Sequence, residues 1–207
     1  MKNKFIIVEG SEGVGKSTQI KTIEKYLKTS NIDYILTREP GGTQFGESIR
    51  SIILDKTNDT HELTDSLLFY AARYENYKRV IMPALESGKT VICDRFHYST
   101  LVYQGIVGKN SIVIDIHNIF DPFFSKNIDH ILYLVASPEV SLQRISKRSK
   151  TDKFESRGLG YLKELDIAYD SIFSKMKNVV KIDTSGNKLD TEKELSLSLD
   201  KIFKRND

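Results

Sequence analysis

The sequence predicts an α/β fold with three layers, in which a five-stranded parallel sheet lies between two layers of helices. Short apolar segments alternate along the chain with segments whose apolar residues recur at helical spacing. Several of the short segments are nearly continuous in Ile, Val, Leu, Tyr and Phe, as expected of strands covered on both faces. Strands and helices that alternate in this way form parallel units with right-handed crossovers. No repeat or linker divides the 207 residues, so we expect a single domain over 1–207.

Five apolar segments are predicted as strands: residues 4–8, 33–36, 90–93, 130–135 and 179–182. Charged residues come just after four of them, namely Glu9, Arg38, Asp94 and Asp183. Ligands of open parallel sheets bind at the carboxyl ends of the strands. We therefore expect the functional site at that edge.

Helical spacing of apolar residues is clearest over 20–27, 63–85 and 162–176. The second segment contains Pro83, which should bend or locally break the helix. Residues 195–199, LSLSL, alternate like a strand, but Leu195 and Leu199 also fit a helix with Ile202. The flanking charges favour a closing helix there.

Composition excludes several classes of protein. The net charge of +3 suits a site that handles phosphates, but it is too small to indicate a nucleic-acid surface. Cys93 is the only cysteine, so a disulfide framework and a thiolate metal cluster are excluded, and we expect it to be buried. The apolar run near the N-terminus is too short for a signal peptide or a membrane span, so we expect a cytoplasmic protein.

A glycine-rich loop is the strongest motif. Residues 10–18, GSEGVGKST, follow an apolar strand, open an amphipathic helix, and satisfy the P-loop pattern G-x-x-x-x-G-K-[ST]. The glycines turn backbone N–H groups toward phosphates, Lys16 reaches the β- and γ-phosphates, and Ser17 can bind Mg²⁺. We expect the whole loop to bind ATP, through Gly10, Ser11, Glu12, Gly13, Val14, Gly15, Lys16, Ser17 and Thr18.

A P-loop alone does not name a reaction, because it serves kinases, GTPases and motor ATPases alike. Two strings near the C-terminus resemble GTPase motifs: 183–186 matches D-x-x-G and 187–190 matches N-K-x-D. They are contiguous, so they cannot lie at both ends of one nucleotide. We interpret them as the loop from the last strand into the last helix.

Three further segments give the sequence a resemblance to bacterial thymidylate kinases, which are P-loop nucleoside monophosphate kinases. They are TREPGGTQFGESIR at 37–50, LLFYAAR at 67–73 and DRFHYSTLVYQG at 94–105. The resemblance is specific from residue 5 to about residue 105 and looser from there to the end. It implies transfer of the γ-phosphate of ATP to dTMP, with magnesium, as a step toward dTTP.

The resemblance implies roles for individual residues. Arg95 and Arg38 would hold the acceptor phosphate, and Asp94 would support the magnesium–water network. The alternative for Arg95 and Arg38 is a surface ion pair, and for Asp94 it is a structural salt bridge with its neighbours. Phe69 and Arg73, one helical turn apart, would stack on the base and read its ring carbonyl, which selects against cytosine. The remaining substrate contacts implied are Glu12 and Tyr103 at the sugar and Ser99, Thr100 and Gln104 around the base.

The polar segment 144–160 is either a solvated loop or a mobile lid over the phosphates. Related enzymes whose glycine loop lacks arginine supply a cation from the lid, and this loop has none. We expect Arg148 to be that cation, with Lys147, Lys150 and Lys153 as alternatives, and Glu155 to approach the sugar or magnesium.

Two other functions stay open from the sequence alone. The first alternative is another P-loop kinase that phosphorylates a different acceptor. The second, from a different functional class, is a nucleotide-dependent switch that catalyses no transfer. The resemblance also implies a homodimer, for which the apolar faces of 63–85 could supply an interface.

Overall fold

The computed structural model describes residues 3–55, 57–147 and 157–203. Its sheet has five parallel strands in the order β2-β3-β1-β4-β5. The strands are β1 (Phe5–Glu9), β2 (Tyr34–Arg38), β3 (Thr90–Asp94), β4 (His130–Val135) and β5 (Val179–Asp183). All five predicted strands are thus confirmed, each to within a residue or two.

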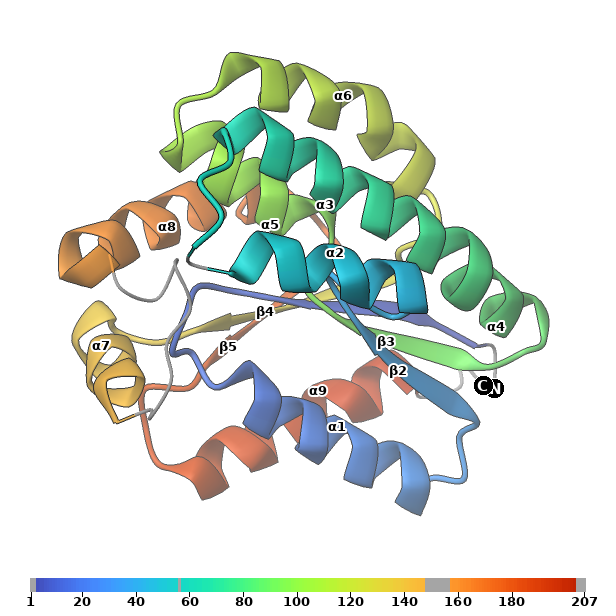
Figure 1. Ribbon diagram of the computed structural model, residues 1–207. Coiled ribbons are helices and arrows are strands. Elements are labelled where there is room, and N and C mark those ends of the chain that lie inside the picture. The colour runs from blue at the N-terminus through green and yellow to red at the C-terminus, as the bar shows by residue number, and fades with distance from the viewer. Residues whose placement is uncertain (1–2, 56, 148–156, 204–207) are drawn as a thin grey trace.

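Helices cover both faces of the sheet, which confirms the three-layer prediction (Figure 1). One face is covered by α1 (Lys16–Thr29) and α9 (Lys188–Phe203). The elements around the other face are α2 (Gln44–Leu54), α3 (Glu62–Asn76), η1 (Tyr77–Ile81), α4 (Met82–Glu86), α5 (His97–Thr100), η2 (Leu101–Val107), α6 (Ser111–Ser125) and α8 (Gly158–Phe173). The short α7 (Pro138–Ser146) lies at the carboxyl edge of the sheet.

The alternation of side chains along β1 divides the core into two parts. Phe5 and Ile7 pack with the aromatic side chains of η1, η2, α6 and α8. Ile6 and Val8 pack with α1 and α9. Because β1 is buried on both faces, the core holds the start of the glycine loop that follows it in a fixed position.

Two details of the helices agree with the sequence. The predicted helix over 63–85 is interrupted just before Pro83: α3 is followed by the π-helical turn η1, and α4 begins after it. Residues 195–199 belong to α9, where Leu195 and Leu199 are buried. Cys93 is also buried. In the described part of the chain no helix is long and apolar enough to cross a membrane.

The two strings that resemble GTPase motifs have a structural explanation. They form the connection from β5 into α9. Asp183 accepts a hydrogen bond from the backbone N–H of Ser185, and Asn187 accepts one from that of Asp190 at 2.9 Å. Short polar side chains of this kind satisfy free backbone groups at a helix start.

Candidate active site

The glycine loop joins β1 to α1 and is held in a shape that its glycines make possible. Gly10, Gly13 and Gly15 have φ values of 141°, 77° and 85°, in the region that favours glycine. A Cβ on Gly13 would also collide with the backbone of Ser141 in α7. The loop therefore depends on glycine both for its backbone angles and for its close contact with α7.

Lys16 begins α1 with its ammonium group inside the loop. Its Nζ donates to the carbonyl oxygens of Gly10 at 2.9 Å and Ser11 at 2.7 Å. Burial, followed by the nearby charge of Arg95, lowers the pKa of Lys16 to about 8. An anionic phosphate bound by this loop would raise that pKa again and hold the lysine charged.

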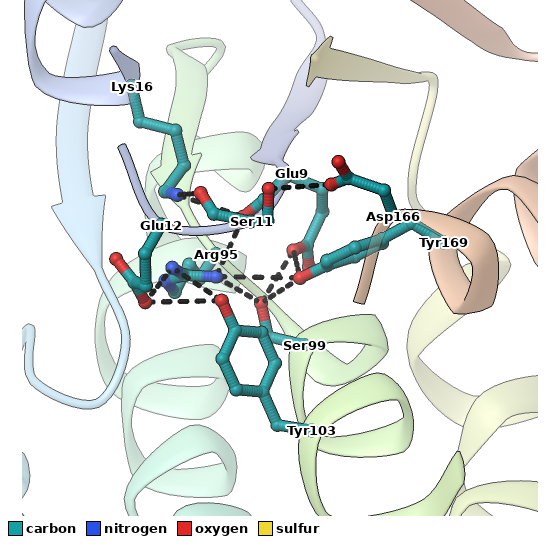
Figure 2. A network of polar contacts seen from close by, with 10 residues as sticks. Glu9, Ser11, Glu12, Lys16, Arg95, Ser99, Tyr103, Asp166 and Tyr169 are labelled. Carbon is teal, nitrogen blue, oxygen red and sulfur yellow. Dashed lines mark hydrogen bonds and ion pairs between the residues drawn. The ribbon is translucent and has the colours of Figure 1, made fainter. Parts of the chain in front are cut away.

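Arg95 lies at the centre of a polar network at the carboxyl end of β3 (Figure 2). Its Nη2 donates to Glu12 at 2.5 Å and to the hydroxyl of Tyr103 at 3.2 Å, while Nη1 donates to the carbonyl of Gly10 and to Ser99. Burial by itself would lower the pKa of Arg95, but the Glu12 carboxylate and its neighbours outweigh burial and raise it. Arg95 also has a left-handed backbone, with φ of 65°. Such strain in a non-glycine residue is typical of functional sites.

The buried carboxylate of Glu9, at the end of β1, is a second anchor of this network. It accepts hydrogen bonds from the backbone N–H of Phe96 at 2.8 Å, from Ser99 at 2.6 Å and from the hydroxyl of Tyr169 at 3.2 Å. Burial raises the pKa of Glu9, although the hydrogen bonds from Ser99 and Phe96 lower it in part. Glu9 thus connects the end of β1 to the segment that follows β3.

Two residues of α8 join the same network, and they were not identified from the sequence. Tyr169 also contacts Ser99, and Asp166 accepts a hydrogen bond from the glycine-loop residue Ser11 at 2.8 Å (Figure 2). Both come from a helix that the sequence identified only by its apolar residues. No motif signals their role, because it arises from the packing of α8 against the glycine loop.

A cavity of about 260 Å³ opens beside this network. Most of the substrate residues predicted from the sequence line it together: Glu12, Arg38, Phe69, Arg73, Arg95, Ser99, Thr100, Tyr103 and Gln104. Lys16, Ser17 and Asp94 line it as well, so the loop and the predicted base pocket share one space.

Arg73 is held rigidly at the wall of this cavity. Its Nε donates to Glu39 at 2.6 Å, and Nη2 donates to Thr100 at 3.0 Å. Its Nη1 is buried without a hydrogen-bond partner among the residues that the structure describes. A fixed donor that lacks a partner at a cavity wall is suited to bind a carbonyl oxygen of a ligand. Phe69, one turn away on α3, lines the same cavity.

Arg38 and Arg50 add positive charge to the cavity. Arg38 is more than half exposed and pairs with Glu47 at 2.9 Å. This contact matches the alternative of a surface ion pair, although Arg38 also lines the cavity. Arg50, which was not identified from the sequence, donates to the carbonyl of Pro40 at 3.0 Å. Its position within the segment 37–50 was the available signal.

Comparisons with known proteins agree with this geometry. A family model described as thymidylate kinase matches residues 8–195. A thymidylate kinase from Caldicellulosiruptor saccharolyticus is 38% identical over 99% of this chain and 100% of its own length. One from Francisella tularensis subsp. holarctica is 36% identical over 98% of each chain.

The chain belongs to the thymidylate kinase family. It is thus a phosphotransferase, as the sequence predicted. The crystal structure of thymidylate kinase from Ehrlichia chaffeensis superposes on it with a TM-score of 0.73, at 25% identity over 99% of this chain and 100% of that one. The family and the α/β fold inferred from the sequence are therefore confirmed.

Thymidylate kinase chemistry implies a magnesium ion, and two residues of the cavity fit one. Asp94 ends β3, and its Oδ1 is buried without a hydrogen-bond partner among the described residues. Ser17, in the first turn of α1, offers a hydroxyl oxygen on the same cavity. Oxygen donors of this kind are the ligands that magnesium prefers.

Not every predicted residue of this thymidylate kinase reaches the cavity. Val14 is buried in the core, so only its backbone is available to phosphates, and Thr18 is exposed on α1. Lys147 is exposed at the end of α7. The other lid residues predicted to act, Arg148, Lys150, Lys153 and Glu155, lie outside the described residues.

One described cation of the segment 144–160 does reach the glycine loop. Arg144 on α7 donates to the carbonyl oxygens of Thr184, at 2.6 Å, and of Gly13, at 3.4 Å. It therefore ties the glycine loop to the residue that follows β5. Nothing in the sequence had singled it out within that segment.

Proposed function

We propose that this enzyme transfers the γ-phosphoryl group of ATP directly to dTMP, giving dTDP and ADP, with magnesium as cofactor. The observation that carries the proposal is the shared cavity of Lys16, Arg95 and Arg73. A donor phosphate at the glycine loop and a base at Arg73 would place the acceptor phosphate beside Arg95. Phosphoryl transfer needs this kind of positioning and neutralisation of charge more than covalent chemistry.

The selection of the base would rest on Arg73 and Phe69. The buried Nη1 of Arg73 can donate to the carbonyl at ring position 4 of thymine. Cytosine has an amino group there, so two donors would face each other. A site that hydrogen-bonds a substrate group strongly rejects analogues without that group, because the polar group of the site is then left unpaired.

The transfer itself would use the cations that surround the phosphates. Lys16 and Arg95 would stabilise the charge that builds on the moving phosphoryl group, and Arg38 and Arg50 would hold the acceptor phosphate. Glu12, fixed by Arg95 and Tyr103, would accept a hydrogen bond from the sugar. The ring of Tyr103 would favour deoxyribose by occupying space that a 2′-hydroxyl needs.

Ser17 and Asp94 would hold the magnesium ion, which neutralises phosphate charge and orients the β- and γ-oxygens when bound. The segment 144–160 would act as a lid within a single kinase domain, with Arg148 as its cation. We further propose a cytoplasmic homodimer that feeds dTTP synthesis, with no membrane or nucleic-acid partner. Exposed apolar side chains of Leu67 and Tyr74 on α3 support an interface on that helix.

A coupled assay of ADP release tests the proposal across dTMP, dUMP, dCMP and dGMP at fixed ATP and magnesium. We expect kcat/KM for dTMP to exceed that for dCMP by at least about 100-fold. Lys16→Ala should abolish turnover, whereas Lys21→Ala, which changes an exposed lysine of α1, should not. Equal turnover with dCMP would refute the base assignment, and turnover that needs no acceptor would refute the reaction.

A further inference from the structure

Three potential metal ligands that do not line the substrate cavity meet between α5 and α6. His97 begins α5, and His117 and Asp121 lie one turn apart on α6. One ligand atom from each lies within 4.8 Å of the others. Neither His117 nor Asp121 lines the substrate cavity, so the phosphotransfer chemistry does not account for the cluster.

Hydrogen bonding alone leaves this cluster incompletely satisfied. The Nε2 of His97 lies 2.8 Å from Oδ1 of Asp121, but the Nε2 of His117 is 3.9 Å from the same oxygen, beyond hydrogen-bond distance. His117 is nevertheless almost fully buried, and its Nδ1 has no partner among the described residues. Among the three described side chains, a hydrogen bond joins only His97 to Asp121, and Tyr98 donates to the same Oδ1 at 3.2 Å.

The spacing of the three atoms suits a tetrahedral ion. Zinc bonds of about 2.1 Å separate neighbouring ligand atoms by about 3.4 Å. The two distances to Asp121, 2.8 and 3.9 Å, lie on either side of that value, and the ligand atoms of the two histidines lie within 4.8 Å of each other. The two imidazole rings are nearly parallel, at 16°, with their centroids 5.2 Å apart.

We propose that His97, His117 and Asp121 form a binding site for a divalent transition-metal ion, of which Zn²⁺ is the best fit. Two imidazoles and one carboxylate are one of the donor sets of three-ligand zinc sites, which keep a fourth position for water. Asp121 is 34% exposed and would be the side from which the ion enters. Both imidazole rings are almost fully buried, and burial favours the neutral form that binds metals.

The surroundings limit the affinity of this site. The positive charge of Arg73 acts on both histidines, although Glu39 offsets part of it. Nδ1 of each histidine is without a described partner, and loss of such supporting contacts typically costs about 10–100-fold in metal affinity. We therefore expect binding on the order of 1 μM, weaker than in structural zinc domains.

The position of the site connects it to the substrate pocket. His97 is followed on α5 by Ser99 and Thr100, which line the substrate cavity. An ion at His97 would join α5 to α6 and restrain that wall of the pocket. Bound metal should therefore raise the melting temperature of the folded protein.

The test uses the full chain, freed of metal with a chelator and kept without nucleotide or magnesium. Zn²⁺ titration by calorimetry should show one ion per chain, and Co²⁺ should give the intense visible absorption of a tetrahedral site. His117→Gln and Asp121→Asn should each weaken binding at least tenfold. His61→Gln and His130→Gln, which change the only other histidines, and Asp94→Asn, at the proposed magnesium site, should leave it unchanged.

A measurement on the unmodified chain tests the proposal without relying on the folding of the variants. Of the four histidine ring signals in an NMR spectrum, Zn²⁺ should shift those of His97 and His117. Shifts confined to His61 and His130, absence of saturable binding, or equal binding by His117→Gln would each overturn the proposal.

Discussion

The Nε atom of Arg73 donates to Oε2 of Glu39 at 2.6 Å, and both side chains are only 2% exposed. Glu39 directly follows β2, and Arg73 lies on α3, so the pair fixes the helix against the edge of the sheet. Because Thr100 and the carbonyl of Phe96 bind another nitrogen of the guanidinium, Arg73 has no freedom to turn away from the cavity. The buried pair therefore orients the proposed base-reading group.

The Glu39–Arg73 pair gives a prediction for the pH dependence of stability. Burial raises the pKa of Glu39 from 4.5 to about 7, in spite of Arg73. Between these values the folded state holds a proton that the unfolded state has released, so this group lowers stability as pH rises from 4.5 to 7. The contribution is at most about 3 kcal/mol, at about 1.4 kcal/mol per pH unit.

Denaturation of Glu39→Gln and of the unmodified enzyme at several pH values between 5 and 8 checks this prediction. The variant should lose less stability than the unmodified enzyme as the pH rises. Glu47→Gln, which changes the more exposed acid paired with Arg38, is the control and should not flatten the profile. A profile of Glu39→Gln parallel to that of the unmodified enzyme would contradict the raised pKa.

Phe69→Ala should raise KM for dTMP about tenfold, because stacking of an aromatic ring on a base contributes about 1–3 kcal/mol. The KM for ATP should not change. Ile119→Ala is the control, since Ile119 is an apolar side chain of α6 that is 72% exposed and does not line the cavity. Steady-state kinetics with each substrate varied in turn separates the two constants, and an unchanged KM for dTMP would remove Phe69 from the base pocket.

Arg95→Ala should lower kcat about 100-fold or more, because it removes a charge aimed at the transferred group. The kcat of Arg95→Lys should lie between those of Arg95→Ala and the unmodified enzyme, since lysine keeps the charge but lacks the planar guanidinium group. Arg79→Ala removes an exposed arginine paired with Glu75 and should have little effect. Circular dichroism of each variant checks folding, because Arg95 also donates to the carbonyl of Gly10. If Arg95→Ala keeps its full kcat, Arg95 does not act on the phosphates.

Asp94→Asn should raise the magnesium concentration needed for half-maximal activity by about tenfold, the effect typical of residues that support a metal site. Asp115→Asn on α6 changes an exposed carboxylate away from the cavity and serves as control. The measurement is activity against free magnesium at saturating ATP and dTMP. Identical magnesium curves for the two variants would exclude Asp94 from the metal site.

Arg148→Ala should lower kcat about 100-fold while KM for dTMP changes little, since a lid cation would act on the transition state. Lys147→Ala should change kcat less. Single-turnover kinetics would separate the chemical step from product release. A larger loss in Lys147→Ala than in Arg148→Ala would assign the lid cation to the lysine.

The sequence by itself determined the fold class, the glycine loop and the family. Periodicity and continuous apolar segments report burial directly, so the strands were predicted to within a residue or two. The glycine loop was predictable because its chemistry needs fixed residue types at fixed spacing over a few positions. Phe69, Arg73 and Tyr103 were predicted as substrate residues from matched segments, and all three line one cavity.

Only the tertiary structure decided which side chains support that site. Asp166 reaches the glycine loop at Ser11, and Tyr169 reaches Glu9 at the end of β1, because α8 packs beside both, and no local pattern records such contacts. The same holds for Glu39, whose partner is 34 positions away, and for His97 and Asp121, which are 24 apart. Hydrogen bonds and metal sites depend on distances of a few ångströms between elements, and those distances exist only once the helices have packed on the sheet.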